Sequence, residues 1–259
     1  MRAENYNAAR RQFALILERH ADNADALYGQ GRALLHQRRF SAAAISFEEA
    51  WKLSRDGRTA ACCAYAVLMM HGQTVLARGL LEKSVAAGFR NAAVHNNLAY
   101  CYLMEDRPAI AKEQLEAATD GTNEPAACLY NRAQWALKIS AMRQNIPDFA
   151  AVNRALKHTN PTRQLYVTAA LTYALAAEYT RDSQQVGPFL DQALTYCDRA
   201  IAEGCDRKAL QAIGRSAPLL AANERFAELL PRARQTASPP NGFAPVVDPM
   251  SGLNEDIRL

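Results

Sequence analysis

Residues 24–57, ADALYGQGRALLHQRRFSAAAISFEEAWKLSRDG, contain two amphipathic segments joined by a short turn. In the first segment, at 25–37, small and apolar residues recur at spacings of three and four, which is typical of a helix. The second segment, at 41–53, places Ala43, Phe47 and Ala50 on one face. The stretch therefore predicts a pair of helices that approach closely at a small residue, Gly31.

The pattern of this pair returns with a fixed period of 34 residues along the first half of the chain. Three columns run in register: the alanines Ala9, Ala43, Ala77 and Ala111; the large apolar residues Phe13, Phe47, Leu81 and Leu115; and Gly31, Tyr65, Ala99 and Ala133. Self-similarity at this period is typical of stacked helix hairpins. We expect a bulky residue in the alanine column to overpack the helix pair, at a cost of about 1–3 kcal/mol.

The columns resemble the pattern of the tetratricopeptide repeat (TPR) family. That pattern has a small residue at repeat position 8, alanine at 20, a large apolar residue at 24 and alanine at 27, which the first complete repeat matches with Gly31, Ala43, Phe47 and Ala50. The third repeat matches with Ala99, Ala111, Leu115 and Ala118, and Asn97 and Asn131 stand at the frequent asparagine position. Tyr65 departs from the pattern at the small position, which favours wider packing there. The resemblance covers residues 6–137 and implies an all-α, right-handed superhelical α-solenoid of antiparallel helix pairs.

The resemblance and the breaks along the chain predict one TPR-like helical repeat domain over 1–236. Its expected parts are a half-repeat at 1–23, repeats at about 24–57, 58–91, 92–125 and 126–160, a divergent repeat at about 161–205 and a terminal cap at about 206–236. In the divergent repeat, Gly187 and Pro188 predict the start of a helix after a loop at 180–186. Residues 237–259 are rich in proline and glycine and predict a disordered tail, with a short recognition motif at 243–249 as the alternative.

Composition and motifs argue against chemistry in this chain. The net charge of +4 comes from basic residues scattered between acidic ones, which favours solvated helix faces over a nucleic-acid surface. No histidine pair has the spacing of a zinc site, and no nucleophile or phosphate-loop motif occurs. The six cysteines form no C-x-x-C pair and are interpreted as reduced and structural. We therefore expect no enzyme activity, metal, cofactor or membrane partner, and a cytoplasmic location.

The resemblance implies that helix A of each repeat lines an inner groove. The residues carried over to that groove are Tyr28, Arg32, His36, Cys62, Met69, Met70, Asn96, Tyr100, Met104, Tyr130, Gln134 and Lys138. Methionines adapt to irregular partners, and tyrosines add contact area and a hydroxyl. The set predicts binding of an extended or helical segment of another protein, and Tyr100 and Tyr130 are expected to be its aromatic anchors.

Two other functions remain open at this level. The chain opens on a helix B with no helix A before it, which indicates either an N-terminal cap or the C-terminal piece of a longer protein. Because TPR arrays often follow bacterial signalling enzymes, the alternative function is a regulatory or targeting domain of an enzyme such as a Ser/Thr protein kinase. The third hypothesis is weak self-association through the open half-repeat.

Overall fold

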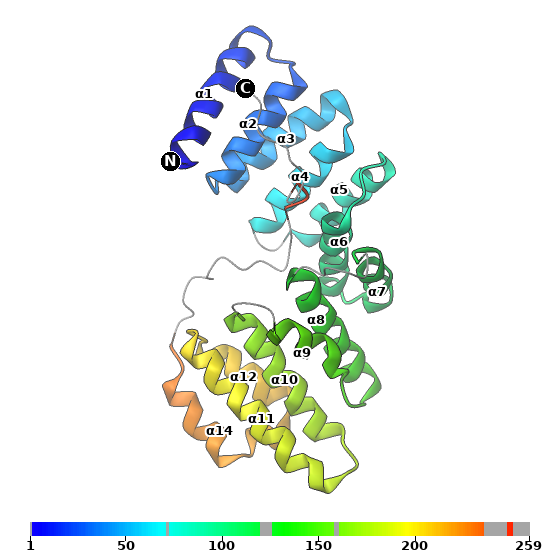
Figure 1. The fold of residues 1–259 in the computed structure, drawn as a ribbon, viewed down its shortest axis with the longest axis vertical. Helices are drawn as coiled ribbons and strands as arrows, with labels where there is room; N and C mark the ends of the chain where they lie inside the picture. The colour runs from blue at the N-terminus through cyan, green and yellow to red at the C-terminus, as the bar shows by residue number, and fades with distance from the viewer. Residues whose placement is uncertain (1, 71–72, 120–125, 158–160, 236–247, 251–259) are drawn as a thin grey trace. The chain divides into compact units, whose positions relative to one another are not determined.

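The computed structural model describes residues 2–70, 73–119, 126–157, 161–235 and 248–250 of the 259-residue chain (Figure 1). The described residues are helical apart from turns and one isolated bridge between Asp206 and Arg234. Consecutive helices pack in pairs, so the expected all-α solenoid of antiparallel helix pairs is confirmed. The chain forms two compact units: unit 1 comprises Met1–Asn123 and Ala244–Leu259, and unit 2 comprises Glu124–Phe243.

Unit 1 contains seven helices among its described residues. They are α1 (Arg2–Arg19), α2 (Ala24–His36), α3 (Phe40–Ser54), α4 (Gly57–Met69), α5 (Thr74–Ala86), α6 (Ala92–Met104) and α7 (Pro108–Ala117). Helices α2, α4 and α6 are the helix A elements of successive pairs, and each helix packs against the next along the chain.

The alanine column lies in the core of unit 1. Ala43, Ala77 and Ala111 have no exposed surface, and Ala9 in α1 has 4%. Gly31 explains the need for small residues, because a Cβ atom added there would lie 2.7 Å from the ring of Phe47. Phe47 is itself fully buried, so its ring has no room to retreat. The small column and the large column therefore face each other across the helix pair.

An asparagine or aspartate side chain caps the start of each helix A in unit 1. Asn23 and Asn91 accept the backbone N–H groups of Ala26 and Val94, each at 2.9 Å, and Asp56 caps α4 in the same way. Such caps satisfy backbone donors that have no partner inside the helix. The caps thus fix where α2, α4 and α6 begin, and so the register of the face these helices form.

Unit 2 contains the remaining described helices. They are α8 (Ala126–Arg143), α9 (Phe149–Lys157), α10 (Arg163–Tyr179), α11 (Ser183–Ala202), α12 (Arg207–Ser216), α13 (Pro218–Ala221), α14 (Glu224–Leu229) and the 3-10 turn η1 (Leu230–Arg232). The expected helix start at Gly187 and Pro188 is wrong: α11 begins at Ser183 and Pro188 lies inside it. The side chain of Asp182 caps the helix by accepting the backbone N–H of Gln184, and this cap sets the earlier start.

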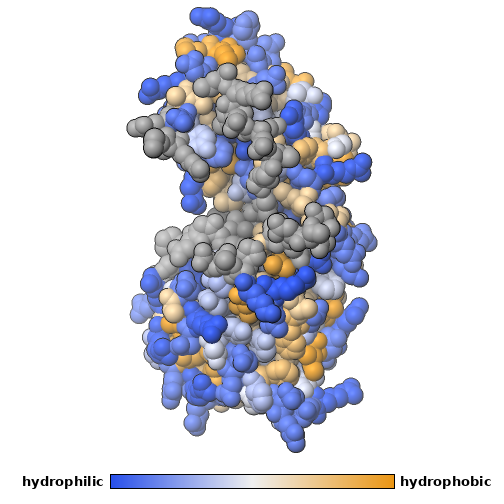
Figure 2. Space-filling view, viewed as in Figure 1, coloured by the Kyte–Doolittle hydropathy of each residue, from blue (hydrophilic) through white to orange (hydrophobic). Residues whose placement is uncertain are grey.

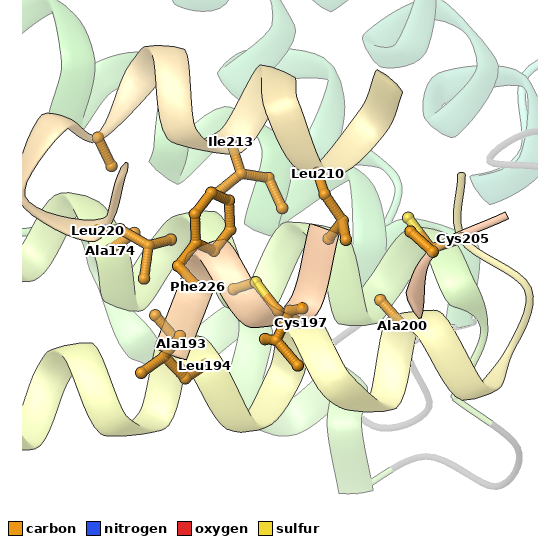
Figure 3. Packing of buried hydrophobic residues seen from close by; sticks show 14 residues of the cluster. Ala174, Ala193, Leu194, Cys197, Ala200, Cys205, Leu210, Ile213, Leu220 and Phe226 are labelled. Carbon is orange, nitrogen blue, oxygen red and sulfur yellow. The ribbon is translucent and has the colours of Figure 1, made fainter. Parts of the chain in front are cut away.

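The core of unit 2 gathers around Phe226 of α14 (Figure 3). Its ring packs with Ile213 and Leu220, and Ala193 and Cys197 of α11 approach from the other side. All five side chains are 3% exposed or less. The short helices after residue 206 therefore cover the hydrophobic surface of the pair formed by α10 and α11.

The structure differs from the expectation of a disordered tail at three residues. Asp248, Pro249 and Met250, here called the tail segment, pack on unit 1, where Pro249 is buried and Met250 is 3% exposed. The rest of the tail, 237–247 and 251–259, lies outside the described residues. A proline-rich composition does not predict an ordered structure. The carboxylate of Asp248, the ring of Pro249 and the thioether of Met250 nevertheless allow this short segment to make specific contacts.

Candidate functional site

The tail segment lies against the helix A elements of unit 1. It contacts Arg32 of α2 and Asn91 at the start of α6, and its carboxylate acts electrostatically on Tyr65 of α4. Figure 1 shows the segment in red beside α4. We call the surface formed by α2, α4 and α6 around Arg32, Tyr65 and Asn91 the helix-A face.

Arg32 and Asp248 form the central polar contact of this face. The Nη1 atom of Arg32 donates to both carboxylate oxygens of Asp248, at 2.8 and 2.9 Å. The two side chains are only 10% and 19% exposed. A guanidinium with so little access to water needs an anionic partner, because burying a charge without one is strongly unfavourable. In this structure the carboxylate of Asp248 is that partner.

The charges at the face shift the pKa values of their neighbours in consistent directions. Burial is the largest single effect on the pKa of Arg32 and lowers it, but Asp248, with smaller effects of Cys62 and Tyr28, raises the pKa on balance. Burial, and then the charge of Asp248, raise the pKa of Tyr65. At His36, burial and the charge of Arg32 lower the pKa, while Asp248 opposes them. Burial is the largest effect on the pKa of each of these groups, and the charges of Arg32 and Asp248 follow it.

Asn91 forms a hydrogen bond with the backbone of the tail segment. While its Oδ1 caps α6, its Nδ2 donates to the carbonyl oxygen of Pro249 at 2.7 Å. Asp248 in turn accepts the backbone N–H of Met250 at 3.0 Å, an arrangement that folds the segment into a local turn. One amide therefore couples the start of α6 to the position of the segment, and the segment holds its own shape.

The predicted groove residues of unit 1 have different surroundings. Tyr28, Met69, Met70 and Tyr100 are half-buried, and Met104 is exposed, whereas His36 is exposed on one side and stacks its ring on Tyr6 at 4.3 Å on the other. The hydroxyl of Tyr28 lies 4.0 Å from Cys62 Sγ, so that these side chains join α2 to α4. Cys62 and Asn96 have no exposed surface, and the predicted contact of these two with a partner therefore finds no support. Asn96 instead donates to the side chain of Asn97 at 3.3 Å.

The other three predicted residues belong to unit 2. Tyr130, Gln134 and Lys138 are half-buried along α8. Gln134 donates to Thr168 of α10 at 2.7 Å and to the Tyr130 hydroxyl at 3.2 Å. The amide of Gln134 thus links α8 to α10. The two predicted aromatic anchors lie in different units, Tyr100 in unit 1 and Tyr130 in unit 2. Their role in binding stays a prediction.

Sequence reasoning missed Tyr65 and Asn91 as site residues and identified Arg32. The departure of Tyr65 from the small column was a usable signal, because a bulky residue at a crossing position must find space elsewhere. The motif alternative at 243–249 included Asp248 and Pro249. No periodic pattern pointed to Asn91, which was interpreted as the end of a repeat.

Other surfaces in the described part of the chain have fewer features of a binding site. A hollow of about 410 Å³ in unit 2 is lined by residues of α11, α14 and η1, but its walls carry exposed ion pairs such as Arg232 with Asp198. Figure 2 shows hydrophobic residues in small patches among hydrophilic ones on the visible face. Across the described ranges, no cluster of His, Cys, Asp or Glu could hold a metal ion. No helix in those ranges is both long and apolar enough to cross a membrane.

Comparison with known proteins identifies the class of fold. No protein-family model matches the chain. No curated protein matches it with significance. The solved structure of YrrB, described as a TPR protein with an unusual peptide-binding site, superposes with a TM-score of 0.51 at 14% sequence identity. The match covers 71% of this chain and 91% of that one. The chain is therefore a TPR-like helical repeat array, as the columns of its first half predicted.

Proposed function

We propose that this protein is a non-catalytic interaction module that binds a short peptide segment on the helix-A face of unit 1. The observation that supports this most is the tail segment itself. Three consecutive residues are held there by a side-chain ion pair, a hydrogen bond to the backbone and burial of two apolar side chains. Contacts to the backbone, to charged groups and to apolar side chains are those by which protein modules recognise short peptides.

The chemistry of the face favours peptide over other ligands. Arg32 supplies a planar cation suited to a carboxylate, and Asn91 supplies a donor for a main-chain carbonyl. Tyr28, Tyr65 and Tyr100 add half-buried aromatic surface on the same three helices. Aromatic and arginine side chains carry most of the binding energy at protein interfaces. YrrB, which shares the fold, is itself described as having a peptide-binding site.

Selection of peptides from a random library on the immobilised full chain tests this function. It is run on the wild type and on the Asp248→Ala chain, so that an occupied face does not hide the result. We expect enriched peptides whose affinity falls at least tenfold on Arg32→Gln, with unchanged affinity on Arg232→Gln, a matched arginine from an exposed ion pair of unit 2. If neither the wild type nor the Asp248→Ala chain enriches peptides, or if the peptides bind both arginine variants equally, the helix-A face is excluded as the binding site.

A further inference from the structure

We propose that the tail segment is an intramolecular ligand that occludes the helix-A face until a segment with the same aspartate–proline–apolar chemistry displaces it. The inference rests on the proposed function and adds the partner's chemistry and its regulation. The three residues occur in the stretch APVVDPMSGL, residues 244–253.

The first argument is the buried charge of Arg32. With 10% of its side chain exposed, the guanidinium depends on a carboxylate, and Asp248 supplies one through both oxygens. A competing segment must therefore bring its own carboxylate to the same place, since leaving Arg32 buried without a counter-charge is strongly unfavourable. This selects for aspartate or glutamate at the first position.

The second argument is the fit of the two residues that follow. Pro249 is buried, and a proline has no backbone N–H that would need a partner there. Its carbonyl oxygen is the group that Asn91 recognises. Met250 is 3% exposed, and its backbone N–H is satisfied by Asp248. The Asp248 carboxylate, the Pro249 carbonyl and the Met250 N–H are thus each paired, as the buried polar groups of a bound ligand should be.

The third argument is the tether. Twelve residues, 236–247, separate the last described residue of unit 2 from Asp248. A segment of the same chain competes at an effective concentration that does not depend on how dilute the chain is. An effective concentration about ten times the Kd of the free segment would weaken an outside competitor about tenfold. Occlusion therefore needs only modest intrinsic affinity.

Fluorescence anisotropy with a labelled APVVDPMSGL peptide tests the inference on the full chain. We expect the peptide to bind the Asp248→Ala chain at least tenfold more tightly than the wild type. Asp198→Ala is the matched control, because Asp198 forms an exposed ion pair with Arg232 in unit 2, and this variant should behave as the wild type. Binding to Asp248→Ala should be lost on adding Arg32→Gln, and a peptide with asparagine in place of aspartate should bind no chain.

Each negative outcome of these binding experiments would contradict a different part of the proposal. Equal, Arg32-dependent binding to the wild type and Asp248→Ala would overturn occlusion while leaving the proposed function standing. Absence of APVVDPMSGL binding to Asp248→Ala, with library peptides still binding through Arg32, would overturn the assigned ligand chemistry alone. Loss of Arg32 dependence for all peptides would overturn both. Occlusion that strengthens with chain concentration would assign the segment to a second copy and overturn the intramolecular form.

Discussion

At the scale of single residues, the close approach of α2 and α3 depends on Gly31. Its missing side chain leaves room for the buried ring of Phe47, and a Cβ atom would lie 2.7 Å from that ring. The neighbouring Gly29 faces the ring of Phe13 in the same way. Small residues in this array are therefore explained by contact with large ones on the adjacent helix.

Gly31→Ala should lower the free energy of unfolding by about 1–3 kcal/mol, because the new methyl group overpacks the contact with Phe47. Gly79→Ala is the matched control in the same unit: nothing lies within 4 Å of an added Cβ, so better helix propensity should raise stability by about 0.5–1 kcal/mol. Urea unfolding followed by circular dichroism measures both. Equal midpoints for the two variants would show that Gly31 is not a crossing point.

His36 reports on the ion pair beside it. Burial and Arg32 lower its pKa from 6.5, and Asp248 partly restores it. Asp248→Ala should therefore lower the His36 pKa further, which an NMR titration of the ring resonances would detect. An unchanged His36 pKa would show that Asp248 does not sit at Arg32.

The same shift has a consequence for stability. Because the folded pKa lies below that of the unfolded chain, the unfolded state takes up the His36 proton first as the pH falls. His36 should therefore contribute a loss of stability as the pH drops from about 6.5 toward its folded pKa.

At the scale of elements, α11 contains a residue that its sequence pattern does not favour. Pro188 lies six positions into the helix, where it lacks the N–H that would donate to the carbonyl of Gln184. Pro188→Ala should raise the free energy of unfolding by about 1–3 kcal/mol. Gln192→Ala, at an exposed site of the same helix, should change it by less than about 0.5 kcal/mol. A lower stability for Pro188→Ala would mean that the helix begins after the proline.

Local pattern predicted the two helices of the first pair, at 25–37 and 41–53, to within a residue of α2 and α3, because small and large residues recur there at helical spacing. It failed at the start of α11, where a glycine–proline pair has a strong local preference for a turn but the Asp182 cap and packing against α10 extend the helix. The site was only partly predictable: family positions gave Arg32, whereas the role of Asn91 depends on the tail.

At the scale of the whole molecule, the contacts between the helix-A face and the tail segment join residues far apart in sequence. Arg32 and Asp248 are separated by 216 positions, and Asn91 and Pro249 by 158. No periodicity links such positions, so composition alone indicated a disordered tail. Only the folded chain shows that the tail supplies the carboxylate that the buried guanidinium of Arg32 requires.

A photo-crosslinker placed at residue 250 tests the central claim, that the helix-A face of unit 1 binds the tail segment. Met250 is replaced by a diazirine analogue of methionine in the full chain, which is irradiated at low concentration and mapped by mass spectrometry. Because Met250 is 3% exposed on this face, we predict intramolecular adducts confined to α2, α4 and α6, with a yield that falls in the Asp248→Ala background. Adducts on the helices of unit 2, or a yield that Asp248→Ala leaves unchanged, would contradict the account.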